Sequence, residues 1–69
     1  MITDHGVRTL YEDTLHRGYL LERDGKFDMA IARYNDALNI AKSYKDSAEI
    51  ERCRAIISSA KNKMNDRCF

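Results

Sequence analysis

The stretch from Gly18 to Leu38, GYLLERDGKFDMAIARYNDAL, decides how this chain folds. Its Asp24-Gly25 pair marks a turn, because a glycine at such a place can take the left-handed backbone conformation that ends a helix. On either side of the pair, apolar residues recur at three- and four-residue steps, the spacing of one face of an α-helix. The stretch is therefore predicted to hold the end of one helix, a tight turn and most of a second helix.

The same periodicity extends in both directions and predicts three helices, over residues of about 4–24, 27–43 and 46–64, with a frayed tail at 65–69. The chain contains no proline, and its β-branched residues never form an alternating run, so no strand is expected. Because short linkers make consecutive helices antiparallel, the expected fold class is all-α. Residues 1–69 are predicted to form a single domain, a three-helix antiparallel bundle.

The start of each predicted helix carries a residue suited to capping free backbone N–H groups. These residues are Thr3 or Asp4 for the first helix, Asp28 for the second and Asp46 for the third. Glu49 follows Asp46 by three residues, so the two form an approximate capping box.

Composition and length limit the classes of protein to which the chain can belong. With 69 residues it is one small domain, and a core of this size typically supplies only about 3–5 kcal/mol of stability. It has no run of about 18 apolar residues, so no membrane insertion is expected. Its first five residues lack the regions of a signal peptide. We therefore expect a cytoplasmic protein in which Cys53 and Cys68 are free thiols.

The Gly18–Leu38 stretch resembles a tetratricopeptide repeat, a 34-residue helix–turn–helix unit in which small residues lie where the paired helices cross. The matching positions are Gly18, Gly25, Phe27, Ala30, Tyr34 and Ala37. The chain departs from the repeat pattern at Thr14, Leu21 and Lys42. Only one repeat is present, and a single repeat cannot bury its own apolar face. The resemblance therefore implies a hairpin that the third helix completes.

The chain is also similar to microtubule-interacting and transport (MIT) domains, which are three-helix bundles resembling one such repeat plus a helix. The matching residues are Gly25, Phe27, Ala30 and Tyr34 in the hairpin, and Cys53, Ala60, Lys61 and Lys63 in the third helix. The loop before the third helix and the second helix itself are both shorter than in those domains. Because a fold does not determine a function, the two resemblances imply a fold and no particular function.

No motif for catalysis, phosphate binding or metal binding is visible, so we expect no enzyme activity, no cofactor and no metal. His16 follows Glu12 by four residues, which places both on one side of a helix. An exposed hydrogen-bonded pair is the expected role of these two residues. Cys53 lies within an apolar stripe and is interpreted as a small core residue.

These observations favour a non-catalytic protein–protein interaction module: an adaptor, a scaffold or a small inhibitor. A three-helix unit of this kind leaves a groove between its first and third helices, into which a partner helix or peptide can place apolar side chains. The candidate contact residues are Leu10, Tyr11, Tyr19, Leu20, Ile40, Tyr44, Ile50, Ile56 and Ile57.

Two alternatives remain open at this level. Surplus apolar surface on a thin core could be covered by a second copy of the chain, as a homodimer. The third helix could instead contact the phosphates of a nucleic acid as a small regulator, which is less favoured because the net charge is only +1. The residues of that basic face are Arg52, Arg54, Lys61, Lys63 and Arg67.

Overall fold

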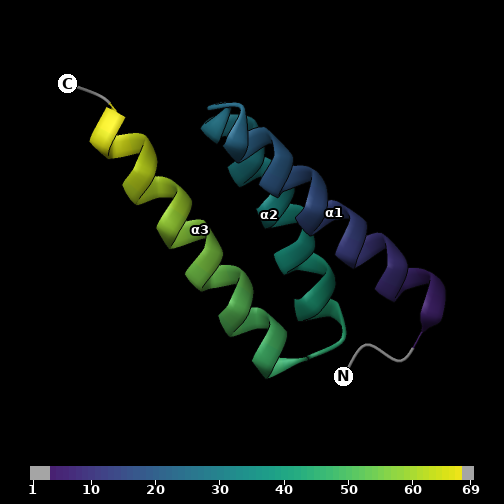
Figure 1. Ribbon diagram of the computed structural model, residues 1–69. Helices are drawn as coiled ribbons and strands as arrows, with labels where there is room; N and C mark the ends of the chain where they lie inside the picture. The colour runs from purple at the N-terminus through teal and green to yellow at the C-terminus, as the bar shows by residue number, and fades with distance from the viewer. Residues whose placement is uncertain (1–3, 68–69) are drawn as a thin grey trace.

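The computed structural model describes residues 4–67. Three α-helices follow one another, α1 (His5–Arg23), α2 (Phe27–Ser43) and α3 (Ser47–Arg67). Successive helices run antiparallel (Figure 1), and residues 4–67 contain no strand. The prediction of an all-α fold with three packed helices is confirmed.

Both turns between helices close with the same pair of backbone hydrogen bonds. At the end of α1, the N–H of Gly25 bonds to the carbonyl of Glu22, and the N–H of Lys26 bonds to that of Leu21. Gly25 has a φ of 81°, so it holds the left-handed conformation that this turn requires. Lys45 holds the same position at the end of α2 with a φ of 53°. Unlike glycine, lysine has a Cβ atom that disfavours this conformation.

Side-chain caps form at two of the three helix starts. The Asp4 carboxylate accepts from the N–H of Val7 at 3.2 Å, and the Asp46 carboxylate accepts from the N–H of Glu49 at 3.3 Å. Asp28 differs from its expected role, because α2 already begins one residue earlier and its N-cap makes no side-chain hydrogen bond. Asp28 lies in the first turn of α2, where a negative charge still faces the positive end of the helix dipole.

The third helix continues to Arg67, three residues past its expected end at Met64. No proline or glycine follows Met64, so no residue type that commonly ends a helix interrupts α3 there. Cys68 and the last residue lie outside the described residues, as does Thr3, the alternative cap of α1.

The middle helix α2 holds the other two helices together. Figure 1 shows α2 between α1 and α3, and α2 packs against both of them while α1 and α3 approach each other far less closely. The molecule is elongated, with extents of 43 × 19 × 12 Å. One face of α2 can therefore form the floor of a groove whose walls are α1 and α3.

The core is made mostly of small side chains. Its buried apolar members are Tyr11, Ala30, Tyr34, Ala37, Ala41, Cys53, Ile57 and Ala60. Alanine lets helix backbones approach closely, but it buries little apolar area, so the larger aliphatic residues are left half-buried around the core. A thin core of this kind agrees with the low stability expected from chain length.

The core divides into two clusters along the length of α2. Tyr11, Ala37, Ala41 and Cys53 form the Tyr11 cluster, toward the turn between α2 and α3. Ala30, Tyr34, Ile57 and Ala60 form the Tyr34 cluster, toward the turn between α1 and α2. Each cluster packs α2 against its neighbouring helices at one end of the molecule.

Candidate binding groove

A groove of about 480 Å³ lies between α1 and α3. Its lining residues are Glu12, Leu15, His16, Tyr19 and Glu22 on α1, Tyr34 on α2, and Arg52, Ile56 and Ser59 on α3. The α1 residues recur at steps of three and four, as do the α3 residues, so each set occupies one side of its helix. The two sides face each other across the floor that α2 provides.

The floor depends on the close packing of Gly18 of α1 against Tyr34 of α2. A Cβ atom at Gly18 would lie 2.5 Å from Cε1 of Tyr34 and 2.8 Å from its Cδ1. The absence of a side chain at Gly18 therefore makes room for the Tyr34 ring, which is buried at 3% exposure. This fit fixes the rotation of α1 about its own axis relative to α2, and so fixes which α1 side chains face the groove.

The middle of the groove is apolar. Leu15 and Ile56 are half-buried on opposite walls, while Tyr19 keeps 52% of its surface exposed. The guanidinium of Arg23 lies 6.0 Å from the centre of the Tyr19 ring, at the outer range of a cation–π contact. An aromatic ring with a polar tip in such a place is typical of binding surfaces.

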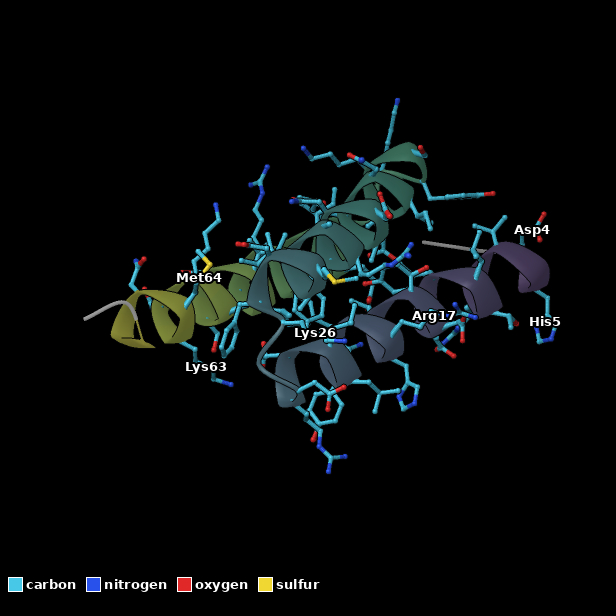
Figure 2. The ribbon with its side chains drawn as sticks, turned by 90° about the horizontal axis from the view of Figure 1, so that it is seen from above. Asp4, His5, Arg17, Lys26, Lys63 and Met64 are labelled. Carbon is cyan, nitrogen blue, oxygen red and sulfur yellow. The ribbon has the colours of Figure 1, made fainter. Side chains whose placement is uncertain are left out.

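A polar bridge crosses the groove at the end near the first turn. Lys63 of α3 donates to the Glu22 carboxylate of α1 at 2.9 Å, and the Tyr34 hydroxyl donates to the same carboxylate at 3.4 Å. Figure 2 shows Lys63 and Met64 leaving α3 on different sides, with Lys63 toward the end of α1. Burial of the phenol, together with the nearby negative charge of Glu22, raises the pKa of Tyr34 to about 12.

A second polar bridge joins α1 and α3 at the opposite end. The Tyr11 hydroxyl donates to the Glu49 carboxylate at 2.5 Å and lies 3.2 Å from the sulfur of Cys53. A phenol has a single proton, so the thiol of Cys53 is the donor in the second contact. Burial of Tyr11, aided by its contacts with Cys53 and Glu49, raises the pKa of its phenol.

The contact with Tyr11 also changes the part that Glu49 plays at the start of α3. In a complete capping box, the glutamate side chain reaches back to the backbone N–H of the capping residue. Only the half in which Asp46 accepts from the N–H of Glu49 has that form here, since the Glu49 carboxylate accepts from Tyr11. A residue predicted from local pattern to serve its own helix instead ties α3 to α1.

A smaller hollow of about 340 Å³ continues the groove past this second bridge. It is lined by Arg8, Tyr11, Glu12, Asp46, Ala48, Glu49 and Arg52. Glu12 and Arg52 line both hollows, so the two form one line along the boundary of α1 and α3. Most residues that line the smaller hollow have charged side chains, whereas Leu15, Tyr19 and Ile56 line the larger one.

The structure places the nine candidate contact residues in several environments. Tyr19 and Ile56 line the main groove, and Tyr11 lines the smaller hollow. Tyr11 and Ile57 are core residues at 3% and 8% exposure, because they lie where α1 and α3 face α2. Neither can offer a large free surface to a partner.

The remaining candidates lie away from the groove. Ile40, Tyr44 and Ile50 are half-buried against the Tyr11 cluster. Leu10 and Leu20 are exposed, at 56% and 42%, but neither lines a hollow. These two leucines project from other sides of α1 than Tyr19 does.

The five basic residues of the third helix do not share one face. Arg52 lines the groove and Lys63 bridges to α1. Residues two positions apart on an α-helix point to nearly opposite sides, so Arg54 and Lys61 lie on the other side of α3. The position of the Arg67 side chain lies outside the described part of the chain. A single basic strip therefore does not form among the four residues whose side chains are described.

Several groove residues are absent from the candidates drawn from the sequence. Glu22, Tyr34 and Ser59 had no sequence signal as contact residues, because their role depends on how the helices are rotated against each other. Glu12 and His16 do share one side of α1, as their spacing predicted. They form no hydrogen bond with each other in the described structure, since Glu12 pairs with Arg8 at 3.6 Å instead.

The described residues contain no group of three or more His, Cys, Asp or Glu side chains that could hold a metal ion. Over the same residues, none of the helices has an apolar stretch long enough to span a bilayer. Comparisons of the chain with models of protein families, with curated proteins and with solved structures found no match.

Proposed function

We propose that this chain is a non-catalytic protein–protein interaction module, acting in the cytoplasm as an adaptor, a scaffold or a small inhibitor. Its binding site is the groove between α1 and α3, which takes a helix or peptide of another protein. The observation that carries the proposal is the apolar centre of the groove, where Tyr19 is exposed beside the half-buried Leu15 and Ile56. The tetratricopeptide-like and MIT-like hairpin remains part of this proposal, supported by the close contact of Gly18 with Tyr34.

The physical basis is that the groove holds apolar surface that the fold itself does not cover. Burying such surface contributes about 25 cal/mol per Å². Tyrosine is among the residues that most often contribute a large part of binding free energy at an interface. A partner that covers Tyr19, Leu15 and Ile56 together would bury a continuous apolar surface. Single exposed residues scattered over the molecule would contribute less binding free energy.

The test compares two neighbouring exposed residues of α1. Peptides selected from a displayed random library on the full chain are measured for affinity against Tyr19→Ala and against Leu20→Ala. Both positions are exposed, but only Tyr19 lines the groove. We expect Tyr19→Ala to weaken binding by roughly tenfold or more, which is the cost of truncating an interface hot spot. Leu20→Ala should leave affinity within about twofold.

Equal losses in the two variants, or no selected peptide at all, would count against a binding groove. Light scattering on the full chain distinguishes the homodimer alternative, since a dimer that Tyr19→Ala dissociates would mean that a second copy covers the groove. The nucleic-acid alternative receives less support, because Arg54 and Lys61 lie on the other side of α3 from Arg52 and Lys63.

A further inference from the structure

We infer that the partner segment places one basic side chain, a lysine or an arginine, on Glu22, where Lys63 lies in the free chain. Lys63 is then a competitor within the chain that the partner displaces. This inference rests on the proposed function and adds two things to it, the chemistry of the partner and a contact that limits its affinity.

Carboxylates outnumber cations along the groove and its smaller continuation. The four carboxylates among the lining residues are those of Glu12, Glu22, Asp46 and Glu49, and the two cations are those of Arg8 and Arg52. Arg8 lies 3.6 Å from Glu12, and Arg52 lies 3.6 Å from Glu49, so each cation is paired with one carboxylate. The two carboxylates beyond these pairs give the lining a negative excess, which favours a basic occupant over an acidic one.

Of these two carboxylates, Asp46 caps the start of α3, whereas Glu22 is paired with a residue that does not line the groove. The side chain of Glu22 is only 13% exposed, while that of Lys63 is 55% exposed. A carboxylate with so little access to water requires a cation beside it. An exposed lysine has no such requirement, and ion pairs of exposed groups contribute little to stability. Glu22 therefore provides a cation site whose present occupant is held weakly.

Replacing Lys63 on Glu22 by a cation of the partner changes few interactions. Glu22 stays paired, the Tyr34 hydroxyl keeps its bond to the same carboxylate, and the Lys63 ammonium moves into water. One cation takes the place of another, so the charge next to Arg23, which lies over the Tyr19 ring, is unchanged. The partner therefore gains an ion pair with a mostly buried carboxylate and removes only an exposed contact.

The position of Glu22 also determines where the basic side chain stands in the partner. Tyr19 precedes Glu22 by three residues and Leu15 precedes Tyr19 by four, so the three lie on one side of α1. A segment that covers Leu15, Tyr19 and Ile56 with apolar side chains then reaches Glu22 with the next side chain toward the first turn. In a helical partner, this basic residue lies three or four positions from an apolar one.

The first step of the test asks whether the occupant needs a cation. Peptides from a displayed random library are selected on the full chain, and those that no longer bind Tyr19→Ala are sequenced. We expect lysine and arginine to be enriched over aspartate and glutamate in this set. In the strongest of these peptides, each basic residue is then replaced singly by methionine. One replacement should weaken binding by roughly tenfold, because that residue loses its charged hydrogen bond to Glu22.

The second step locates that cation on the chain. Glu22→Gln removes the negative charge and keeps an oxygen for the Tyr34 hydroxyl. We expect this variant to bind the basic peptide roughly tenfold more weakly and to bind the methionine-substituted peptide within about twofold of the original chain. A variant that had merely lost its fold would weaken both peptides equally.

The third step tests the competition by Lys63. Lys63→Met removes the competing ammonium and keeps a good helix-forming residue. Lys61→Met makes the same change in net charge on the other side of α3. We expect Lys63→Met to bind the basic peptide at least about threefold more tightly, and Lys61→Met to stay within about twofold.

Three results would overturn the inference and leave the proposed groove intact. They are groove-dependent peptides in which no single basic residue matters, equal weakening of both peptides by Glu22→Gln, and equal affinities in Lys63→Met and Lys61→Met. Failure to obtain any peptide sensitive to Tyr19→Ala would contradict the proposed function itself.

Discussion

At each end of the molecule a buried tyrosine donates a hydrogen bond to a glutamate, but the two tyrosines lie on different helices. At the end near the second turn, Tyr11 of α1 donates to Glu49 of α3, so the two outer helices are tied together through a buried ring. At the end near the first turn, Tyr34 belongs to the middle helix and donates to Glu22 of α1. There α3 reaches α1 through the longer side chain of Lys63.

The difference shows that the helix that carries the tyrosine determines which side chain links α1 to α3. A ring on the outer helix α1 lets its hydroxyl reach α3 directly, below the smaller hollow that Tyr11 lines. A ring on the middle helix fills the space next to α1 and leaves room above itself, so Tyr34 becomes part of the groove floor. Variants at the two ends should therefore have unequal effects.

The largest effect is expected from Gly18→Leu, at the end with the groove. Its Cβ alone would lie 2.5 Å from the Tyr34 ring, and that ring is buried and cannot move without opening the cluster. Overpacking of this kind costs about 3 kcal/mol, which is most of the stability of so small a domain. Urea denaturation followed by circular dichroism measures the loss.

Gly6→Ala is the control at the other end of α1. The nearest atom to a Cβ at Gly6 is an oxygen of Asp4 at 3.4 Å, which is an ordinary contact. Since alanine favours a helix over glycine by up to about 1 kcal/mol, this variant should be as stable as the original or more so. A Gly18→Leu variant that unfolds at the same urea concentration as Gly6→Ala would show that the Tyr34 ring is not held in place.

The second effect compares the two phenol groups directly. Tyr11→Phe removes the short bond to Glu49 and the partner of the Cys53 thiol, so we expect a loss of about 1–2 kcal/mol. Tyr34→Phe removes one bond of 3.4 Å to a carboxylate that Lys63 still holds, so we expect about 0.5 kcal/mol. Urea midpoints of the two variants give the difference, and a larger loss at Tyr34 would reverse the comparison.

Ionisation of the Tyr11 and Tyr34 phenols at high pH should lower the stability of the fold. Both have a pKa above the ordinary value of 10, so folding favours their protonated forms. Their contribution to stability is complete below about pH 10 and is lost as the pH rises through the folded-state pKa, which for Tyr34 is about 12. Unfolding midpoints measured from pH 8 upward should therefore fall above about pH 10.

Phenylalanine variants provide the control for this titration. The fall in stability above about pH 10 should become shallower in Tyr34→Phe and in Tyr11→Phe, because each variant removes one group that must ionise. Ultraviolet absorbance of tyrosinate, recorded on the folded chain, should lose its late-titrating part in the double variant. An unchanged slope in both variants would mean that other groups cause the alkaline loss.

The helices and the first turn could be predicted from the sequence because their causes are local. Periodic apolar residues, the absence of proline and a glycine in the Asp24-Gly25 pair act within a few residues of one another. The end of α3 was less predictable, since nothing after Met64 stops a helix and the pattern simply weakens. Local signals determine where helices lie along the chain.

The groove could be predicted only in part, because its lining depends on how each helix is rotated against its neighbour. The sequence placed a groove between the first and third helices, but it could not separate Tyr19, which lines it, from Leu20 beside it. That distinction follows from the contact of Gly18 with Tyr34, which orients α1. The Tyr11–Glu49 bond joins residues 38 positions apart, so no local pattern indicates it.

The smallest predicted effect concerns the two turns that end α1 and α2. Gly25 holds its positive φ without strain, whereas Lys45 at a φ of 53° carries a cost of about 1 kcal/mol or more for its Cβ. Lys45→Gly removes that cost but adds backbone entropy to the unfolded chain, so a net gain of a few tenths of a kcal/mol is expected. Lys26→Gly is the matched control, with the same change in charge at a φ of −89°, where glycine relieves nothing. If both variants lose stability equally in urea, Lys45 is not strained. The turn between α2 and α3 would then suit its residue as well as the turn between α1 and α2 suits Gly25.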